Sequence, residues 1–134
     1  MLGVFCSSLL VSHLANAEVA VIVNSANSSA ISDTEISRLF LGKLKKYSAG
    51  DKAVPINQKF GSAIRKEFEK KVLKKSSTQV KAYWSKRVFS GKGKPPKELT
   101  SDKDILAQIS ANKNAIGYID AASINDSVKV IRKF

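Results

Sequence analysis

The sequence has very little of the chemistry on which most enzymes depend. It contains one histidine and one cysteine, and both, His13 and Cys6, lie within the first 17 residues. The rest of the chain therefore has no imidazole base, no thiol nucleophile and no soft metal ligand. It also has no Walker loop, no dinucleotide fingerprint and no calcium loop. We expect no metal site, no cofactor and no enzymatic activity.

Long apolar runs are also scarce, and one apolar stretch lies at the N-terminus. Leu9-Leu10-Val11 lies in an apolar stretch, and Ala15-Asn16-Ala17 fits a small-x-small cleavage site. Residues 1–17 therefore predict a secretory signal peptide, although no Lys or Arg precedes Arg38. The alternative is a buried N-terminal strand or helix. We expect residues 18–134 to form one domain in the periplasm, with no disulfide and no membrane-spanning segment.

Acidic residues are few compared with basic ones. The chain has 23 Lys and Arg against 11 Asp and Glu, which gives a formal net charge of +12. Such a charge favours acidic partners or anionic surfaces, and nucleic acid is the usual partner of strongly basic chains. Export argues against nucleic acid, so we expect none unless the signal peptide is wrongly predicted. Charge alone does not separate a binding role from simple solubility.

The hydrophobic pattern predicts strands that alternate with helices. Short apolar runs, the first of them rich in Val and Ile, predict strands at about 18–23, 53–57, 115–119 and 128–131. Helices are expected at about 32–42, 62–75, 76–89 and 101–112, and the first and third begin with capping boxes. This order predicts an α/β fold with a small mixed, mostly parallel sheet flanked by about four helices. Residues 91–97 are expected to form a basic loop.

Some charged and aromatic side chains have a simple structural interpretation. Glu67 and Glu69 lie among lysines in a predicted helix, so we expect them to be solvated ion-pair partners. Trp84 lies in the apolar pattern of the third helix, and we assign it to the core.

A candidate anion site lies where the second strand gives way to the second helix. The first N–H groups of a helix have no internal partner, and the helix dipole places partial positive charge there. A turn with little side-chain bulk lets a small anion approach them. Arg65 adds a guanidinium on the same helix face. The candidate residues are Gly61, Ser62, Ala63, Ile64 and Arg65, with Gln58 and Lys59 at the rim. The alternative is a self-capped helix with Arg65 in solvent.

Four stretches together resemble the phosphate-binding proteins of bacterial ABC importers. They are the strand at 19–24 with its polar loop, the segment 35–43, the turn and helix at 62–68, and Ala115-Ile116-Gly117-Tyr118. The resemblance implies a periplasmic-binding-protein-like fold, phosphate as the ligand and an ABC permease as a partner. Members of that family have two lobes, and this chain resembles the second lobe only. A homo-oligomer could supply the missing wall.

The resemblance also implies roles for the residues of the turn. In that family a Ser-Gly-Thr turn binds phosphate through hydroxyl and N–H groups. Ser62 matches the serine, whereas Ala63 and Ile64 can offer only backbone N–H groups. Gln58 stands where the family has an arginine, and Lys59 could replace that charge. Arg65 matches a later arginine of the family.

Two hypotheses about function follow. The first is a phosphate-like anion-binding domain, which a cluster of Arg65, Lys59 and Lys66 around the turn would favour. The second is an envelope interaction module with a decayed ligand site, which binds an anionic surface or an acidic partner. A broad lysine face would favour the second, and its candidate residues are Lys70, Lys74, Lys81, Lys86 and Lys92.

Overall fold

The computed structural model describes residue 3 and residues 17–134 of the chain. The predicted signal peptide at 1–17 therefore lies almost entirely outside the described residues. Within the described part, no helix is long and apolar enough to cross a membrane.

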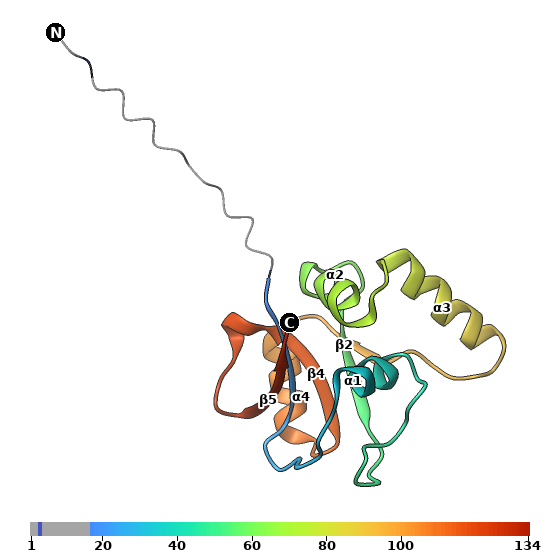
Figure 1. The fold of residues 1–134 in the computed structure, drawn as a ribbon, viewed down its shortest axis with the longest axis horizontal. Helices are drawn as coiled ribbons and strands as arrows, with labels where there is room; N and C mark the ends of the chain where they lie inside the picture. The colour runs from blue at the N-terminus through green and yellow to red at the C-terminus, as the bar shows by residue number, and fades with distance from the viewer. Residues whose placement is uncertain (1–2, 4–16) are drawn as a thin grey trace.

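A five-stranded sheet forms the centre of the fold, with the order β3-β2-β4-β1-β5 (Figure 1). β2 is parallel to both β3 and β4, whereas β1 is antiparallel to both β4 and β5. β1 therefore runs antiparallel to the other four strands, which all point the same way, and this confirms a mixed, mostly parallel sheet. The strands are β1 (Val19–Asn24), β2 (Val54–Gln58), β3 (Lys97–Leu99), β4 (Ala115–Asp120) and β5 (Val128–Lys133).

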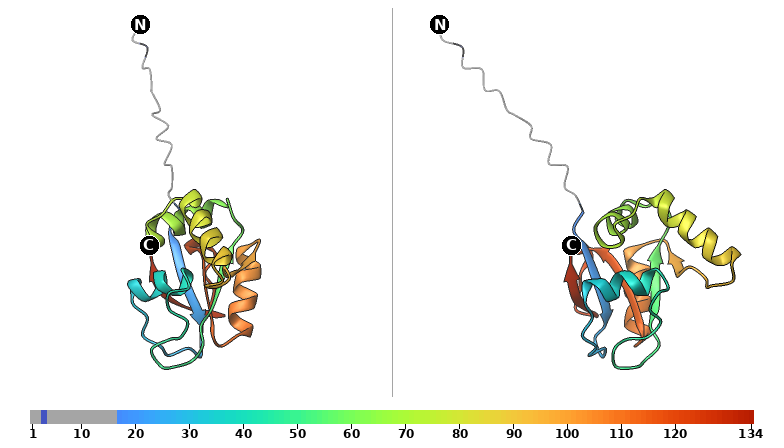
Figure 2. Two further views of the ribbon diagram at one scale, coloured as in Figure 1. Left: turned by 90° about the vertical axis from the view of Figure 1, so that its right-hand side faces the viewer. Right: turned by 45° about the vertical axis from the view of Figure 1, so that its right-hand side comes forward.

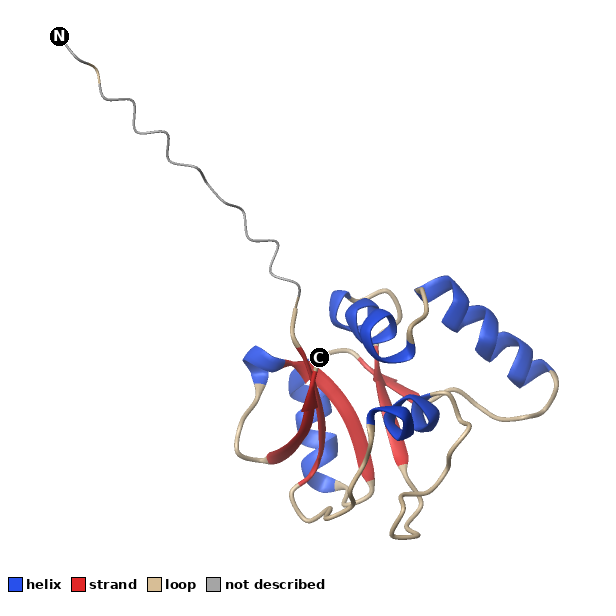
Figure 3. Ribbon diagram, in the orientation of Figure 1, coloured by secondary structure: helices blue, strands red, loops and turns tan. Residues whose placement is uncertain are grey.

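Helices cover both faces of this sheet (Figures 2 and 3). Helix α4 packs on one face, where Ile105 and Ile109 join Ala20 and Ile22 of β1 in one core cluster. The other helices lie over the opposite face and contribute to a second, larger core cluster. The helical segments are α1 (Asp33–Phe40), α2 (Ala63–Phe68), the π-helical η1 (Glu69–Leu73), α3 (Ser77–Phe89), α4 (Asp102–Ala111) and the 3₁₀ turn η2 (Ala121–Ser123).

Local sequence signals explain where these helices begin. Ser32 and Ser76 form the predicted capping boxes, with Glu35 and Gln79 as their partners. Each pair satisfies backbone N–H groups that a helix start leaves free. The predicted helix at 62–75 is found in place, but it divides into α2 and η1 and ends at Lys74, whose φ is 57°.

The larger core carries an aromatic cluster beneath α2. Phe68 stacks on Tyr118 with ring centroids 3.8 Å apart, and Phe40 meets both rings edge-on. Trp84 is 7% exposed and belongs to the larger core cluster, which confirms its assignment to the core. The stacking of Phe68 on Tyr118 fixes α2 against β4.

The prediction that Glu69 is solvated is wrong, although Glu69 is an ion-pair partner. Its side chain is buried and accepts hydrogen bonds from Arg65 Nε at 3.3 Å and from Ser77 Oγ at 2.7 Å. Arg65 and Glu69 are four residues apart, so they share one helix face, and that face turns inward. Glu67 is half-buried and pairs with Lys71 at 3.3 Å, as an ion-pair partner should.

Candidate functional site

The predicted anion site lies at the carboxyl end of β2. Ligands of open α/β sheets bind outside the carboxyl ends of the strands, so this edge is a suitable place for a site. Gly61 has a φ of 83°, a left-handed conformation that glycine adopts without strain. Ser62 is the N-cap of α2, and its Oγ accepts a hydrogen bond from Arg65 N at 3.4 Å.

The turn presents neutral donors to solvent. Within residues 17–134, no group accepts a hydrogen bond from the backbone N–H of Ala63 or Ile64. Ala63 is exposed and Ile64 is half-buried. Lys59 is exposed next to the turn. The structure therefore brings together Lys59, the Gly61 turn and the N–H groups that follow it.

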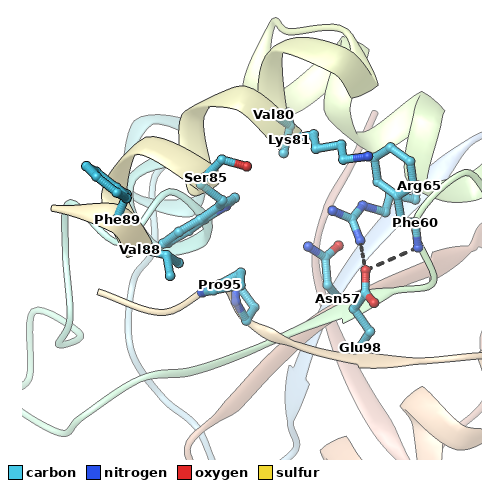
Figure 4. A pocket seen from close by; sticks show the side chains of 12 residues that line it. Asn57, Phe60, Arg65, Val80, Lys81, Ser85, Val88, Phe89, Pro95 and Glu98 are labelled. Carbon is cyan, nitrogen blue, oxygen red and sulfur yellow. Dashed lines mark hydrogen bonds and ion pairs between the residues drawn. The ribbon is translucent and has the colours of Figure 1, made fainter. Parts of the chain in front are cut away.

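Arg65 lies beneath the turn rather than in it. Its side chain is buried, and Nη1 donates to the Gln58 carbonyl at 3.0 Å. The guanidinium also pairs with the carboxylate of Glu69. It pairs with the carboxylate of Glu98 as well (Figure 4). Two carboxylates therefore balance its charge, and its Nε and Nη1 donors are already occupied by protein acceptors. Arg65 is neither a solvated surface charge nor a free cation.

Gln58 does not lie at the rim of the turn. It is 2% exposed, and its Nε2 donates to Asp102 Oδ1 at 2.7 Å and to the Tyr118 carbonyl at 3.2 Å. Asp102 in turn accepts hydrogen bonds from Ser123 Oγ and from Asp120 N. Gln58 therefore joins β2 to the start of α4 and to η2.

The lysines extend well beyond the turn. An open groove of about 550 Å³ runs over η1 and the start of α3. We call its basic wall the lysine face, and it consists of Lys66, Lys70, Lys74 and Lys75. Lys66 belongs to α2, so this face begins close to the turn. Both the small-anion hypothesis and the charged-surface hypothesis thus have basic residues to support them.

A second hollow was missed by the sequence analysis. A groove of about 720 Å³ lies between α3 and the β2–β3 side of the sheet (Figure 4). We call it the α3 groove, and its apolar lining includes Phe60, Val80, Trp84, Val88, Pro95 and Pro96. The apolar pair Val88-Phe89 at the end of a helix, followed by a double proline, is the sequence signal that could have found it. Among the described residues, including those of this groove, no group of His, Cys, Asp and Glu side chains could hold a metal ion.

Comparison with solved structures identifies the class of fold. An ABC-type phosphate transport receptor from Vibrio cholerae matches with a TM-score of 0.61 and 18% identity, over 87% of this chain and 46% of that one. A putative phosphate ABC transporter substrate-binding protein from Clostridium perfringens, with bound phosphate, matches with a TM-score of 0.66 and 18% identity, over 87% and 45%. PstS from Borrelia burgdorferi gives 0.60 and 14%, over 86% and 47%.

The chain therefore has the fold of phosphate ABC transport substrate-binding proteins and spans less than half the length of each. This confirms the predicted resemblance to a single lobe as a likeness of fold. No protein-family model matches the sequence, and no curated protein matches it significantly.

Proposed function

We propose that residues 18–134 form an exported, non-enzymatic solute-binding domain that binds a small oxyanion, and that this anion is phosphate. The observation that carries the proposal is the fold, which is shared with substrate-binding proteins named for phosphate transport. By analogy with them, an ABC permease would be the partner that receives the ligand. The periplasm is the location that the predicted signal peptide implies.

The anion would bind at the turn from Gly61 to Ile64. The Ser62 hydroxyl and the N–H groups of Ala63 and Ile64 would donate to its oxygens, and Lys59 would add charge. Arg65 would hold the turn from below without touching the ligand. Because the turn is open to water, we expect millimolar affinity, equivalent to about 4 kcal/mol. A second lobe or a second copy of the chain would strengthen binding by excluding water.

The test uses a proline at position 63. Ala63 is the first residue of α2, where proline is well tolerated, and Ser62 has the extended backbone (φ −65°, ψ 150°) that proline requires of its predecessor. Ala63→Pro therefore removes one anion donor while preserving the helix. Asp33→Pro, at the same position of α1, is the matched control.

The measurement is thermal unfolding with phosphate, sulfate or chloride at matched ionic strength, because any salt affects a chain with this charge. Phosphate at 100 times its dissociation constant should stabilise the native protein by about 2.7 kcal/mol. That increment should shrink in Ala63→Pro and persist in Asp33→Pro. Equal shifts with every anion, or an increment that Ala63→Pro leaves intact, would refute the site at the turn.

A second candidate function is an envelope interaction module that binds an anionic surface. The observation that favours it is the ion pairing of Arg65, which leaves the turn without a buried free cation while the lysine face stays open. The test is sedimentation with phosphatidylglycerol vesicles. Binding that falls steeply with salt and weakens when Lys70 and Lys74 are changed to Gln would support this function. No retention by anionic vesicles at low salt would exclude it.

A further inference from the structure

The size and the lining of the α3 groove are typical of a ligand pocket. Its volume of about 720 Å³ lies within the range of roughly 300–1,000 Å³ that is usual for small-molecule sites, and such sites combine apolar walls with a few polar groups. Val88 is 51% exposed and Phe89 is 95% exposed, although both belong to the apolar lining. Apolar side chains kept in solvent on one side of a groove would gain from a ligand that covers them.

One polar group at the other end of this groove lacks a partner. Asn57 is 6% exposed, and its Oδ1 accepts the hydroxyl proton of Tyr118. That hydroxyl in turn accepts a hydrogen bond from Gln58 N at 3.2 Å, so its single proton is committed to Asn57. This orientation leaves the Asn57 amide nitrogen facing the groove (Figure 4). Among the described residues, no acceptor receives a hydrogen bond from it.

Charged groups lie beside this amide. The groove lining contains the cations of Arg65 and Lys81 and the carboxylate of Glu98, which Arg65 pairs directly. Lys81 Nζ lies 5.6 Å from the centre of the Phe60 ring and has no ion-pair partner within residues 17–134. The polar end therefore offers one neutral donor and one available positive charge.

We infer that the α3 groove binds a small amphipathic carboxylate, a molecule with one acidic head and an apolar body. The head would accept hydrogen bonds from the Asn57 amide nitrogen and from the Lys81 ammonium. The body would lie along Trp84, Val88 and the two prolines. This ligand differs from the oxyanion proposed for the turn, and the inference does not depend on that proposal.

Other classes of ligand fit the groove less well. A neutral apolar molecule would leave the Asn57 donor buried and unsatisfied, which costs free energy. A cation would meet Lys81 as a like charge, and the Glu98 carboxylate that could attract a cation is already paired with Arg65. Inorganic phosphate is too small to cover Val88 and Phe89. A single acidic head on an apolar body is the chemistry that satisfies both ends at once.

Trp84 provides a direct assay, since it is the single tryptophan of the chain and lines the groove. The probes are decanoate, decanol and decyltrimethylammonium, each kept below the concentration at which it forms micelles or separates. Titration into the full-length protein should give a saturable change in Trp84 fluorescence with decanoate, at least tenfold tighter than with the other two. Equal affinity for decanoate and decanol, or no saturable signal with decanoate, would overturn the inference.

Matched variants test the two head-group contacts. Lys81→Gln should weaken decanoate binding about fivefold, whereas Lys86→Gln, an exposed lysine on the same helix that does not line the groove, should leave it unchanged. Asn57→Asp keeps an acceptor for Tyr118 but loses the donor, so binding should fall about tenfold or more. If Asn57→Asp does not fold, the exposed substitution Val88→Glu should weaken decanoate binding by opposing its charge.

The two sites can be tested separately. Ala63→Pro should leave decanoate binding intact, and phosphate should not displace decanoate from the groove. Decanoate binding that survives both Lys81→Gln and Val88→Glu would contradict the assignment of the groove, whatever the outcome for phosphate.

Discussion

Replacing Arg65 by methionine should strongly destabilise the protein. The guanidinium holds three acceptors, which are the Gln58 carbonyl and the carboxylates of Glu69 and Glu98. Methionine fills similar space but leaves the Glu69 carboxylate, whose side chain is 2% exposed, with Ser77 Oγ as its remaining described partner. An unpaired buried charge is among the most costly defects a core can contain.

The size of the effect follows from the burial of each partner. Removing one member of a buried ion pair destabilises a protein by about 3–5 kcal/mol. The pair with Glu98 adds little, because that side chain is 48% exposed and water screens it. We therefore expect Arg65→Met to lower the free energy of unfolding by about 3–5 kcal/mol, nearly all of it through Glu69.

Urea denaturation of the wild type and of three variants measures this effect. Arg132→Met is the matched control, because Arg132 pairs with Asp33 at 3.0 Å while both side chains are more than half exposed. It should lower stability by about 0–1 kcal/mol. The double variant Arg65→Met/Glu69→Gln removes the stranded charge and should recover a large part of the loss.

A particular pattern of results would refute this reasoning. If Arg65→Met were as mild as Arg132→Met, the buried network would contribute little to stability. If Glu69→Gln failed to restore any stability in the double variant, the loss would come from packing rather than from an unpaired carboxylate.

Two further predictions concern the core around β4. Gly117→Ala should destabilise the protein by about 1–3 kcal/mol, because the new Cβ would lie 3.1 Å from Ile105 and 3.3 Å from Ile109. A urea unfolding midpoint equal to that of the wild type would contradict this packing. Burial raises the pKa of Tyr118 above its ordinary value of about 10, so the stability it contributes is complete below that pH and falls as pH rises further. Above pH 10, the free energy of unfolding of the wild type should fall more steeply with pH than that of Tyr118→Phe, by up to about 1.4 kcal/mol per pH unit. Urea titrations at several pH values measure both dependences, and equal pH slopes would contradict the prediction.

The parts of the fold that the sequence predicted have strong local signals. A continuous Val- and Ile-rich run predicted β1, and the short apolar run Ala115-Ile116-Gly117-Tyr118-Ile119 predicted β4. The capping boxes at Ser32 and Ser76 predicted two helix starts. β3 was missed, because three residues with one half-buried leucine carry no periodic pattern. That strand exists because Lys97–Leu99 pairs in parallel with β2, a contact between distant segments.

The site shows the same division between local and distant causes. The Gly61-Ser62 turn and its free N–H groups follow from neighbouring residues, so the sequence could predict them. Gln58, and the part of the Arg65 network that involves Glu98, depend on partners far along the chain. Arg65 pairs with Glu98, 33 residues away, and Gln58 bonds to Asp102, 44 residues away. No local pattern marks a carboxylate at that distance as a partner.

The ion pairs of Arg65 also affect how the net charge of the chain bears on anion binding. The chain is strongly basic, yet its buried cation at the candidate site is balanced by Glu69 and Glu98. Most of the excess positive charge therefore lies on exposed lysines, where salt screens it, and Lys59 is the only charged group among those proposed to contact an anion at the turn. A ligand at the turn would be held mainly by neutral donors, whose direction selects the shape of the anion more than its charge. The lysine face would attract any anion and select weakly. Selectivity among anions, more than affinity for them, is thus the property that separates the two candidate functions.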